Sequence, residues 1–233
     1  MHPGNAALYN TLGVLMFEQG RFDEASRQYE YAVALRPDDM KYISNLGSAF
    51  MLRGNFDLAA TYYQQAIDIE PTRMAHSNLG MMRFYTGDYN AAIEHQAAAI
   101  ELQPNDHLSH ANLGDMLLAA GRIREARQAY TEADEMASRA LRVNPNDPFI
   151  IMDLAWIKTL LEEHDEARRL IDRALQMIPD DPYVHYYNGL MLNRTGGVSR
   201  ASAALESAGE LGYPSAVLGG GPILAGGRGV FGV

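Results

Sequence analysis

A small residue recurs at nearly constant intervals along this chain, and its period restricts the possible folds more than any other feature. Each of these residues follows a leucine or occupies the equivalent place. The successive steps are 34, 33, 34, 41 and 34 residues, through Gly13, Gly47, Gly80, Gly114, Ala155 and Gly189. A period of this length indicates one supersecondary unit that is repeated along the chain.

Two alanine columns and a proline column keep the same period. Apolar residues recur at helical spacing in both halves of each unit, which predicts a pair of helices. A glycine between the two halves suits a left-handed helix stop, and aspartates after the prolines suit caps of the next helix. The columns are Ala25, Ala59, Ala92, Ala126, Ala167 and Ala201; Ala32, Ala66, Ala99, Ala140, Ala174 and Ala208; Pro37, Pro71, Pro104, Pro145 and Pro179; and, at the turns, Gly20, Gly54, Gly87 and Gly121.

Together with an aromatic residue between the alanines (Tyr29, Tyr63 and Tyr130), these columns resemble the tetratricopeptide repeat. The resemblance implies an all-α fold, a right-handed α-solenoid (superhelix) of helix-turn-helix units. We expect a single solenoid over residues 1–215 and a disordered Gly-rich tail over residues 216–233. The predicted repeats are 6–39, 40–72, 73–106, 107–147, 148–181 and 182–215.

The fifth unit and the step before it depart from the pattern. Ala155 and Glu162 stand where glycines are usual. The step of 41 carries seven surplus residues, which lie between Tyr130 and Ala140. Seven residues make nearly two helical turns, so the insertion lengthens a helix with little change of its buried face. This predicts one long second helix over residues 123–143.

Composition excludes several classes of function. The net charge of −10, without clusters of Lys or Arg, disfavours nucleic acid and anionic membrane surfaces as partners. The absence of cysteine excludes disulfides, thiol catalysis and thiolate metal sites. Neither a signal peptide nor an apolar stretch of about 20 residues is recognisable, so we expect no membrane insertion and a cytoplasmic location.

The sequence contains no recognisable catalytic or metal-binding constellation. Phosphate-binding glycine loops and nucleophile elbows do not occur, and most carboxylates fall at exposed helical positions. His107 and His110 lie three residues apart, but a third ligand at metal spacing is missing. We therefore expect a non-catalytic protein without metal or cofactor.

An asparagine precedes the leucine of three units, at Asn45, Asn78 and Asn112. In the fold that the sequence resembles, first helices line a concave surface, and an amide there can both donate to and accept from a peptide backbone. The row is similar to the asparagine ladder of certain tetratricopeptide scaffolds, including the repeat region of O-GlcNAc transferase. Either these residues clamp an extended peptide or they are polar residues of a helix surface; both interpretations stay open.

Other residues of the first helices complete the predicted peptide-binding surface. Met and aromatic side chains are common at adaptable binding surfaces, although packing between first helices is the alternative. These candidates are Asn10, Phe17, Met51, Met81 and Phe84 in the early units and Phe149, Met152, Trp156, Tyr183 and Tyr186 in the last two.

The pattern as a whole predicts a protein–protein interaction scaffold that binds an extended peptide or partner segment in a groove. The alternative is a self-associating assembly module, or the regulatory repeat region of a larger signalling enzyme or secretion/pilus complex. In that case homo-oligomers would form through the solenoid ends or the Gly-rich tail.

Overall fold

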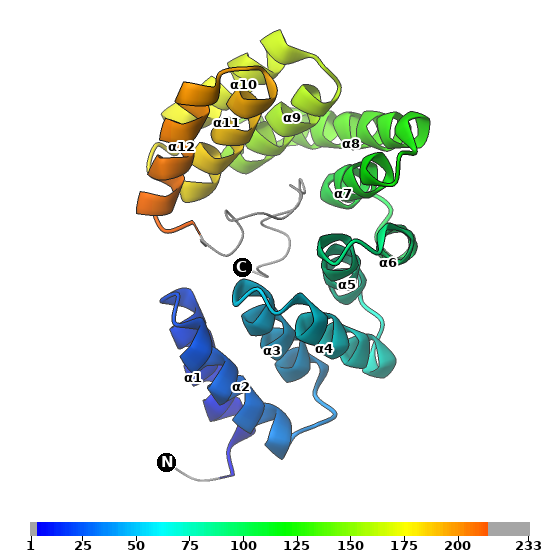
Figure 1. The fold of residues 1–233 in the computed structure, drawn as a ribbon, viewed down its shortest axis with the longest axis vertical. Helices are drawn as coiled ribbons and strands as arrows, with labels where there is room; N and C mark the ends of the chain where they lie inside the picture. Colours follow the sequence, from blue (N-terminus) through cyan, green and yellow to red (C-terminus); the bar gives the residue numbers. More distant parts are fainter. Residues whose placement is uncertain (1–3, 214–233) are drawn as a thin grey trace. The chain divides into compact units, whose positions relative to one another are not determined.

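A computed structural model describes residues 4–213, and the predicted Gly-rich tail (216–233) lies outside them. The described part is all-α and contains twelve helices in successive pairs (Figure 1). The first helices of the pairs are α1 (Ala6–Glu18), α3 (Met40–Leu52), α5 (Arg73–Tyr85), α7 (His107–Ala119), α9 (Pro148–Leu160) and α11 (Pro182–Arg194). The second helices are α2 (Phe22–Leu35), α4 (Phe56–Ile69), α6 (Tyr89–Leu102), α8 (Ile123–Val143), α10 (His164–Met177) and α12 (Val198–Glu210).

The helices form two compact units with three pairs each. The first unit ends at Pro104 and contains α1 to α6, and the second begins at Asn105 and contains α7 to α12. Within each unit every helix packs against the helices that precede and follow it in the chain. The predicted all-α fold of helical pairs is therefore confirmed, whereas one solenoid spanning residues 1–215 stays a prediction.

Aspartate side chains begin most of the first helices, as the sequence predicted. Asp39, Asp106, Asp147 and Asp181 each accept a hydrogen bond from a backbone N–H in the first turn of the helix that follows. Such caps satisfy donors that have no partner inside the helix. They fix where each first helix starts and hence which of its residues face the same side.

A residue in the left-handed region separates the two helices of each pair. Gly20 and Gly121 have φ angles of 72° and 76°, as expected for a glycine helix stop. In the fifth pair Glu162 takes this place with φ 68°, and it is the one residue other than glycine with positive φ among residues 4–213. The fifth pair therefore keeps the turn of the other pairs although it lacks the glycine.

The recurring glycine of the first helices lies against the tyrosine of the second. A Cβ atom built on Gly13 would lie 2.5 Å from the ring of Tyr29, and one on Gly47 would lie 3.0 Å from the ring of Tyr63. In the fifth pair Ala155 and Ile171 occupy these two positions, and both are buried. In this pair, therefore, both the glycine and the tyrosine are replaced, whereas Gly189 of the sixth pair keeps its glycine beside Leu205.

The long second helix of the fourth unit is confirmed. α8 spans Ile123–Val143 and has 21 residues, against 14 in α2, α4, α6 and α10. The assignment of Ala140 to the second alanine column needs correction. Ala133 lies seven residues after Ala126, as Ala32 does after Ala25, and it is fully buried, whereas Ala140 is only partly buried. The extra turns therefore extend α8 beyond its packed alanine.

None of the helices between residues 4 and 213 is long and apolar enough to cross a membrane.

Candidate binding surface on the first helices

The asparagine row begins in the first unit with a direct contact between two candidates. The Asn45 Nδ2 atom donates a hydrogen bond of 2.8 Å to Asn10 Oδ1, which joins α3 to α1. Asn10 is buried and Asn45 is half-buried. These two side chains therefore satisfy each other in part, and Asn45 keeps some exposed surface.

The next two asparagines have buried amide oxygens without a hydrogen-bond partner among the described residues. Asn78 of the first unit and Asn112 of the second are each 3% exposed, and the unpartnered atom is Oδ1 in both. A buried acceptor without a donor costs roughly 1–3 kcal/mol, so native proteins rarely retain one without a reason. The same unpartnered atom therefore recurs at the same position of two successive repeats.

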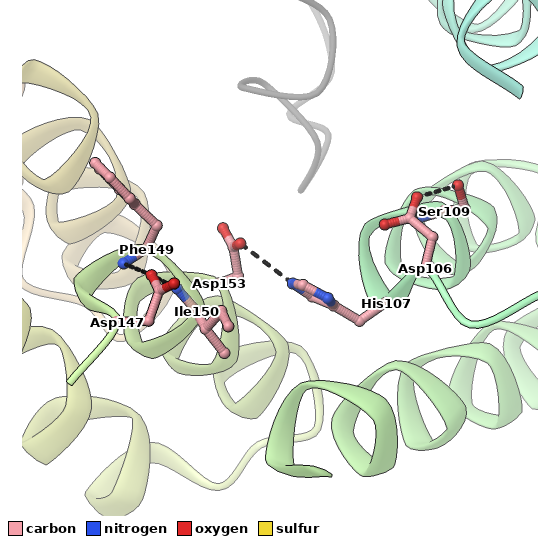
Figure 2. A network of polar contacts seen from close by, with 7 residues as sticks. All are labelled: Asp106, His107, Ser109, Asp147, Phe149, Ile150 and Asp153. Atoms are coloured by element: carbon pink, nitrogen blue, oxygen red, sulfur yellow. Dashed lines mark hydrogen bonds and ion pairs between the residues drawn. The ribbon is translucent and has the colours of Figure 1, made fainter. Parts of the chain in front are cut away.

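In the second unit the asparagine position of the fifth pair is occupied by Asp153. Figure 2 shows its carboxylate pointing toward His107 of α7, and the Nε2 atom of His107 lies 3.2 Å from Asp153 Oδ2. Asp106 and Asp147 cap α7 and α9 close to this pair: Asp106 accepts from the hydroxyl of Ser109, and Asp147 accepts from the N–H of Ile150. Two of these three carboxylates thus lie at the amino-terminal ends of α7 and α9, and that of Asp153 lies in the second turn of α9.

The carboxylates change the proton affinity of His107. Burial alone lowers the pKa of this imidazole, but the hydrogen bond and charge of Asp153, together with the charges of Asp106 and Asp147, raise it above its ordinary value. The effect of these carboxylates on the pKa of His107 therefore outweighs that of burial.

Two other histidines of the first helices contact the second helix of their own pair. His76 Nδ1 lies 3.3 Å from His95 Nδ1 of α6, and His110 Nδ1 lies 3.0 Å from Glu132 of α8. Burial lowers the pKa of both His76 and His95. Across residues 4–213 no group of three or more His, Cys, Asp or Glu side chains is arranged to hold a metal ion.

Most of the apolar candidates are buried. At most 6% of each residue is exposed for Met51, Met81, Phe84, Met152, Trp156 and Tyr186. Phe17, Tyr183 and Phe149 keep more surface: Phe17 and Tyr183 are half-buried, and Phe149 is 41% exposed. The role of these side chains as peptide contacts stays a prediction.

The structure adds a feature of Trp156 that the sequence analysis missed. Its Nε1 atom is buried and has no hydrogen-bond partner within the described chain, and its ring meets that of Tyr187 edge-on at 6.1 Å. At the same repeat position, Ser48 lies 3.0 Å from the hydroxyl of Tyr63, and Asp115 accepts a hydrogen bond of 2.7 Å from Tyr130.

In the fifth pair Ile171 replaces the tyrosine that would have served Trp156 as a partner. The indole N–H therefore has no tyrosine hydroxyl beside it, because the column of Ser48 and Asp115 and the column of Tyr63 and Tyr130 both change in this pair. Reading the two columns jointly in the sequence would have revealed this loss.

Comparison with known proteins agrees with this architecture. Residues 10–73 and 78–140 match a family model described as tetratricopeptide repeat, and residues 128–187 match a second model of the same description. No curated protein sequence matches the chain.

Several solved structures share the fold at low sequence identity. A tetratricopeptide repeat protein from Parabacteroides merdae ATCC 43184 has a TM-score of 0.67 and 19% identity, over 93% of this chain and 82% of that chain. A chain of the APC/C hetero-tetramer Cut9-Hcn1 has a TM-score of 0.64 and 18% identity, over 91% of this chain but only 40% of that chain. YrrB, a TPR protein with an unusual peptide-binding site, has a TM-score of 0.53 and 17% identity, over 77% and 89% of the two chains.

These structural similarities establish the fold alone, since all three identities are low. The family models add the wider class, because tetratricopeptide repeats are generally protein–protein interaction modules. The segments that they match amount to more than half of the residues. The chain belongs to the tetratricopeptide repeat family.

Proposed function

We propose that this protein is a non-catalytic scaffold whose first helices bind an extended segment of a partner protein, with asparagine amides holding the backbone of that segment. One observation carries the proposal. The buried amide oxygens of Asn78 and Asn112 have no donor among the described residues, although they occupy the same position in successive repeats.

A peptide backbone supplies the missing group. Every residue of an extended chain except proline offers one N–H donor and one C=O acceptor, whatever its side chain. An N–H that reaches Asn78 or Asn112 would satisfy the buried oxygen and remove its desolvation penalty. At the first asparagine position the amide already has an internal partner, since Asn45 Nδ2 donates to Asn10 Oδ1.

The proposal also implies an unusual stability pattern. Replacing an unpartnered buried polar group by an apolar one is nearly neutral or stabilising, whereas removing half of a formed hydrogen bond is costly. Asn78→Ala and Asn112→Ala should therefore leave the melting temperature unchanged or raise it. Asn45→Ala should lower it, since Asn10 loses its donor.

Selection from a random library of dodecapeptides against the full chain tests the proposal. The peptides that are recovered are then titrated against the wild type, the variant Asn45→Ala/Asn78→Ala/Asn112→Ala and the control Asn90→Ala, which alters an exposed asparagine of the second helix α6. We expect binding to weaken about 10- to 100-fold in the triple variant, since several hydrogen bonds are lost, and to persist in the control. Equal affinity of all three proteins would refute the proposal.

A further inference from the structure

The row of asparagines ends in the second unit, where the chemistry of the first-helix surface changes. Asn112 of α7 offers an acceptor without a donor, and one pair later Trp156 of α9 offers a donor without an acceptor; neither atom has a partner among residues 4–213. Both residues are 3% exposed. A peptide unit carries one N–H and one C=O, so an extended backbone supplies what each of these two atoms lacks.

Trp156 lies one helical turn beyond Asp153, on the same side of α9. Asp153 stands at the asparagine position of this pair and is 8% exposed. Its carboxylate lies with those of Asp106 and Asp147 in one acidic region around His107 (Figure 2). The indole N–H and this acidic region therefore belong to one stretch of surface.

The Lys and Arg side chains on the first helices of the second unit lie elsewhere, whereas His107, whose pKa is raised, lies beside Asp153. Lys158 is in the last turn of α9, where its Nζ atom contacts Glu163 at 2.9 Å and Asp134 at 3.1 Å. Arg194 is in the last turn of α11. Lys158 and Arg194 thus lie at the carboxy-terminal ends of α9 and α11, whereas Asp106 and Asp147 cap the amino-terminal ends of α7 and α9. A segment that crosses the beginning of α7 and α9 passes the carboxylates of Asp106 and Asp147.

Building on the proposed function, we propose that the second unit binds an extended segment that carries Lys or Arg. The indole N–H of Trp156 donates to a backbone carbonyl of this segment, and the cationic side chain lies beside Asp153. Trp156 thus continues the backbone recognition of the asparagine row with a donor in place of an acceptor, and Asp153 selects for positive charge.

Access to the indole requires a local rearrangement. Because Trp156 is 3% exposed, the carbonyl reaches Nε1 only when neighbouring side chains move aside. The closed arrangement leaves a buried donor unsatisfied, so the hydrogen bond gained on binding offsets part of the cost of opening. Met152, fully buried on the same helix, can repack because its side chain is flexible.

The chain contains a single tryptophan, which gives a direct measurement. In a ¹⁵N-labelled full chain one indole N–H signal is expected, and it belongs to Trp156. Dodecapeptides selected from the random library on the wild type serve as the probe. We expect the recovered peptides to be rich in Lys and Arg, and the indole proton signal to move downfield when they are added.

Two variants separate the contacts. Trp156→Phe keeps an aromatic ring but lacks the N–H, and we expect it to bind the peptides about 5- to 30-fold more weakly. Asp153→Asn should weaken binding of the cationic peptides, whereas the control Asp172→Asn, which removes an exposed carboxylate of the second helix α10, should not. Circular dichroism establishes that each variant is folded.

The outcomes distinguish this inference from the function on which it rests. If the peptides lose affinity for the triple asparagine variant while Trp156→Phe and Asp153→Asn bind normally, the inference is wrong and the proposed function stands. If the library yields no binding peptide, or the triple variant binds as the wild type does, both are wrong. If the indole signal responds to removal of residues 214–233 and not to peptides, the chain's own carboxy-terminal segment is the occupant, and the inference is overturned.

Discussion

The Nε2 atom of His107 lies 3.2 Å from a carboxylate oxygen of Asp153, and this contact joins α7 to α9 within the second unit. The two residues are 46 positions apart in the sequence. Asp153 occupies the position of the asparagines in the earlier repeats. At this position the fifth pair therefore has a carboxylate, and its contact with His107 depends on the protonation of the imidazole.

The pair makes stability depend on pH. Because the pKa of His107 is raised in the folded protein, the protonated imidazole favours folding. This contribution is complete below the unfolded pKa of about 6.5 and disappears as the pH rises through the folded pKa. The stability difference between the wild type and His107→Gln should therefore be larger at about pH 5.5 than at about pH 8.5.

Urea unfolding at the two pH values measures this difference, and NMR titration of the imidazole gives the pKa of His107 itself. In Asp153→Asn the pKa should fall, since the carboxylate no longer outweighs the effect of burial. A difference that grows with rising pH, or an imidazole pKa at or below the ordinary value of 6.5, would contradict the account.

The glycine and tyrosine columns should be energetically coupled. A methyl group on Gly13 would lie 2.5 Å from the ring of Tyr29, so Gly13→Ala should cost about 1–3 kcal/mol through overpacking. Tyr29→Ile should relieve this clash, as Ile171 does beside Ala155. The loss of stability in the double variant should therefore be smaller than the sum of the two single losses by about 0.5–3 kcal/mol.

Thermal or urea unfolding of the two single variants and the double variant gives this coupling energy. Gly13→Ala combined with Tyr31→Ile serves as the control, because Tyr31 is on the same helix but 56% exposed. The control pair should be additive. A coupling energy of zero between Gly13→Ala and Tyr29→Ile would show that the two columns do not depend on each other.

The turn of the fifth pair stores backbone strain that a glycine would release. Glu162 has φ 68°, a conformation that costs side-chain-bearing residues about 1 kcal/mol or more. Glu162→Gly should raise the free energy of unfolding by about 0.5–1 kcal/mol, after the greater flexibility of glycine in the unfolded chain is subtracted.

Gly121→Ala is the matched control at the same turn of the fourth pair, with φ 76° and open space around the added Cβ. It should destabilise the protein by about 1 kcal/mol. Urea unfolding measures both changes. The explanation fails if Glu162→Gly lowers stability to the same extent as Gly121→Ala.

Features that depend on a few neighbouring residues were predictable from the sequence. The ends of α8, the aspartate caps and the left-handed glycines each follow from local rules for helix starts, stops and turns. The helical pairs followed from a repeat whose columns record packing between neighbours. These rules need no knowledge of which side chains meet across the fold.

Features that depend on side-chain register between helices were not predictable in the same way. Aligning the repeat by its ends put Ala140 in the packed column, but burial shows that Ala133 fills it, because the extra turns follow the packing position. The unpartnered atoms of Asn78 and Asn112 are also invisible in sequence, since they are defined by the partners that the fold fails to supply.

A crystal structure of the full chain with a selected dodecapeptide tests the central claim most directly. The account predicts an extended peptide along the first helices, with a backbone N–H group about 2.7–3.2 Å from the Oδ1 atom of Asn78 or of Asn112. A peptide bound to the second helices, or one that leaves both amide oxygens without a backbone donor, would contradict it.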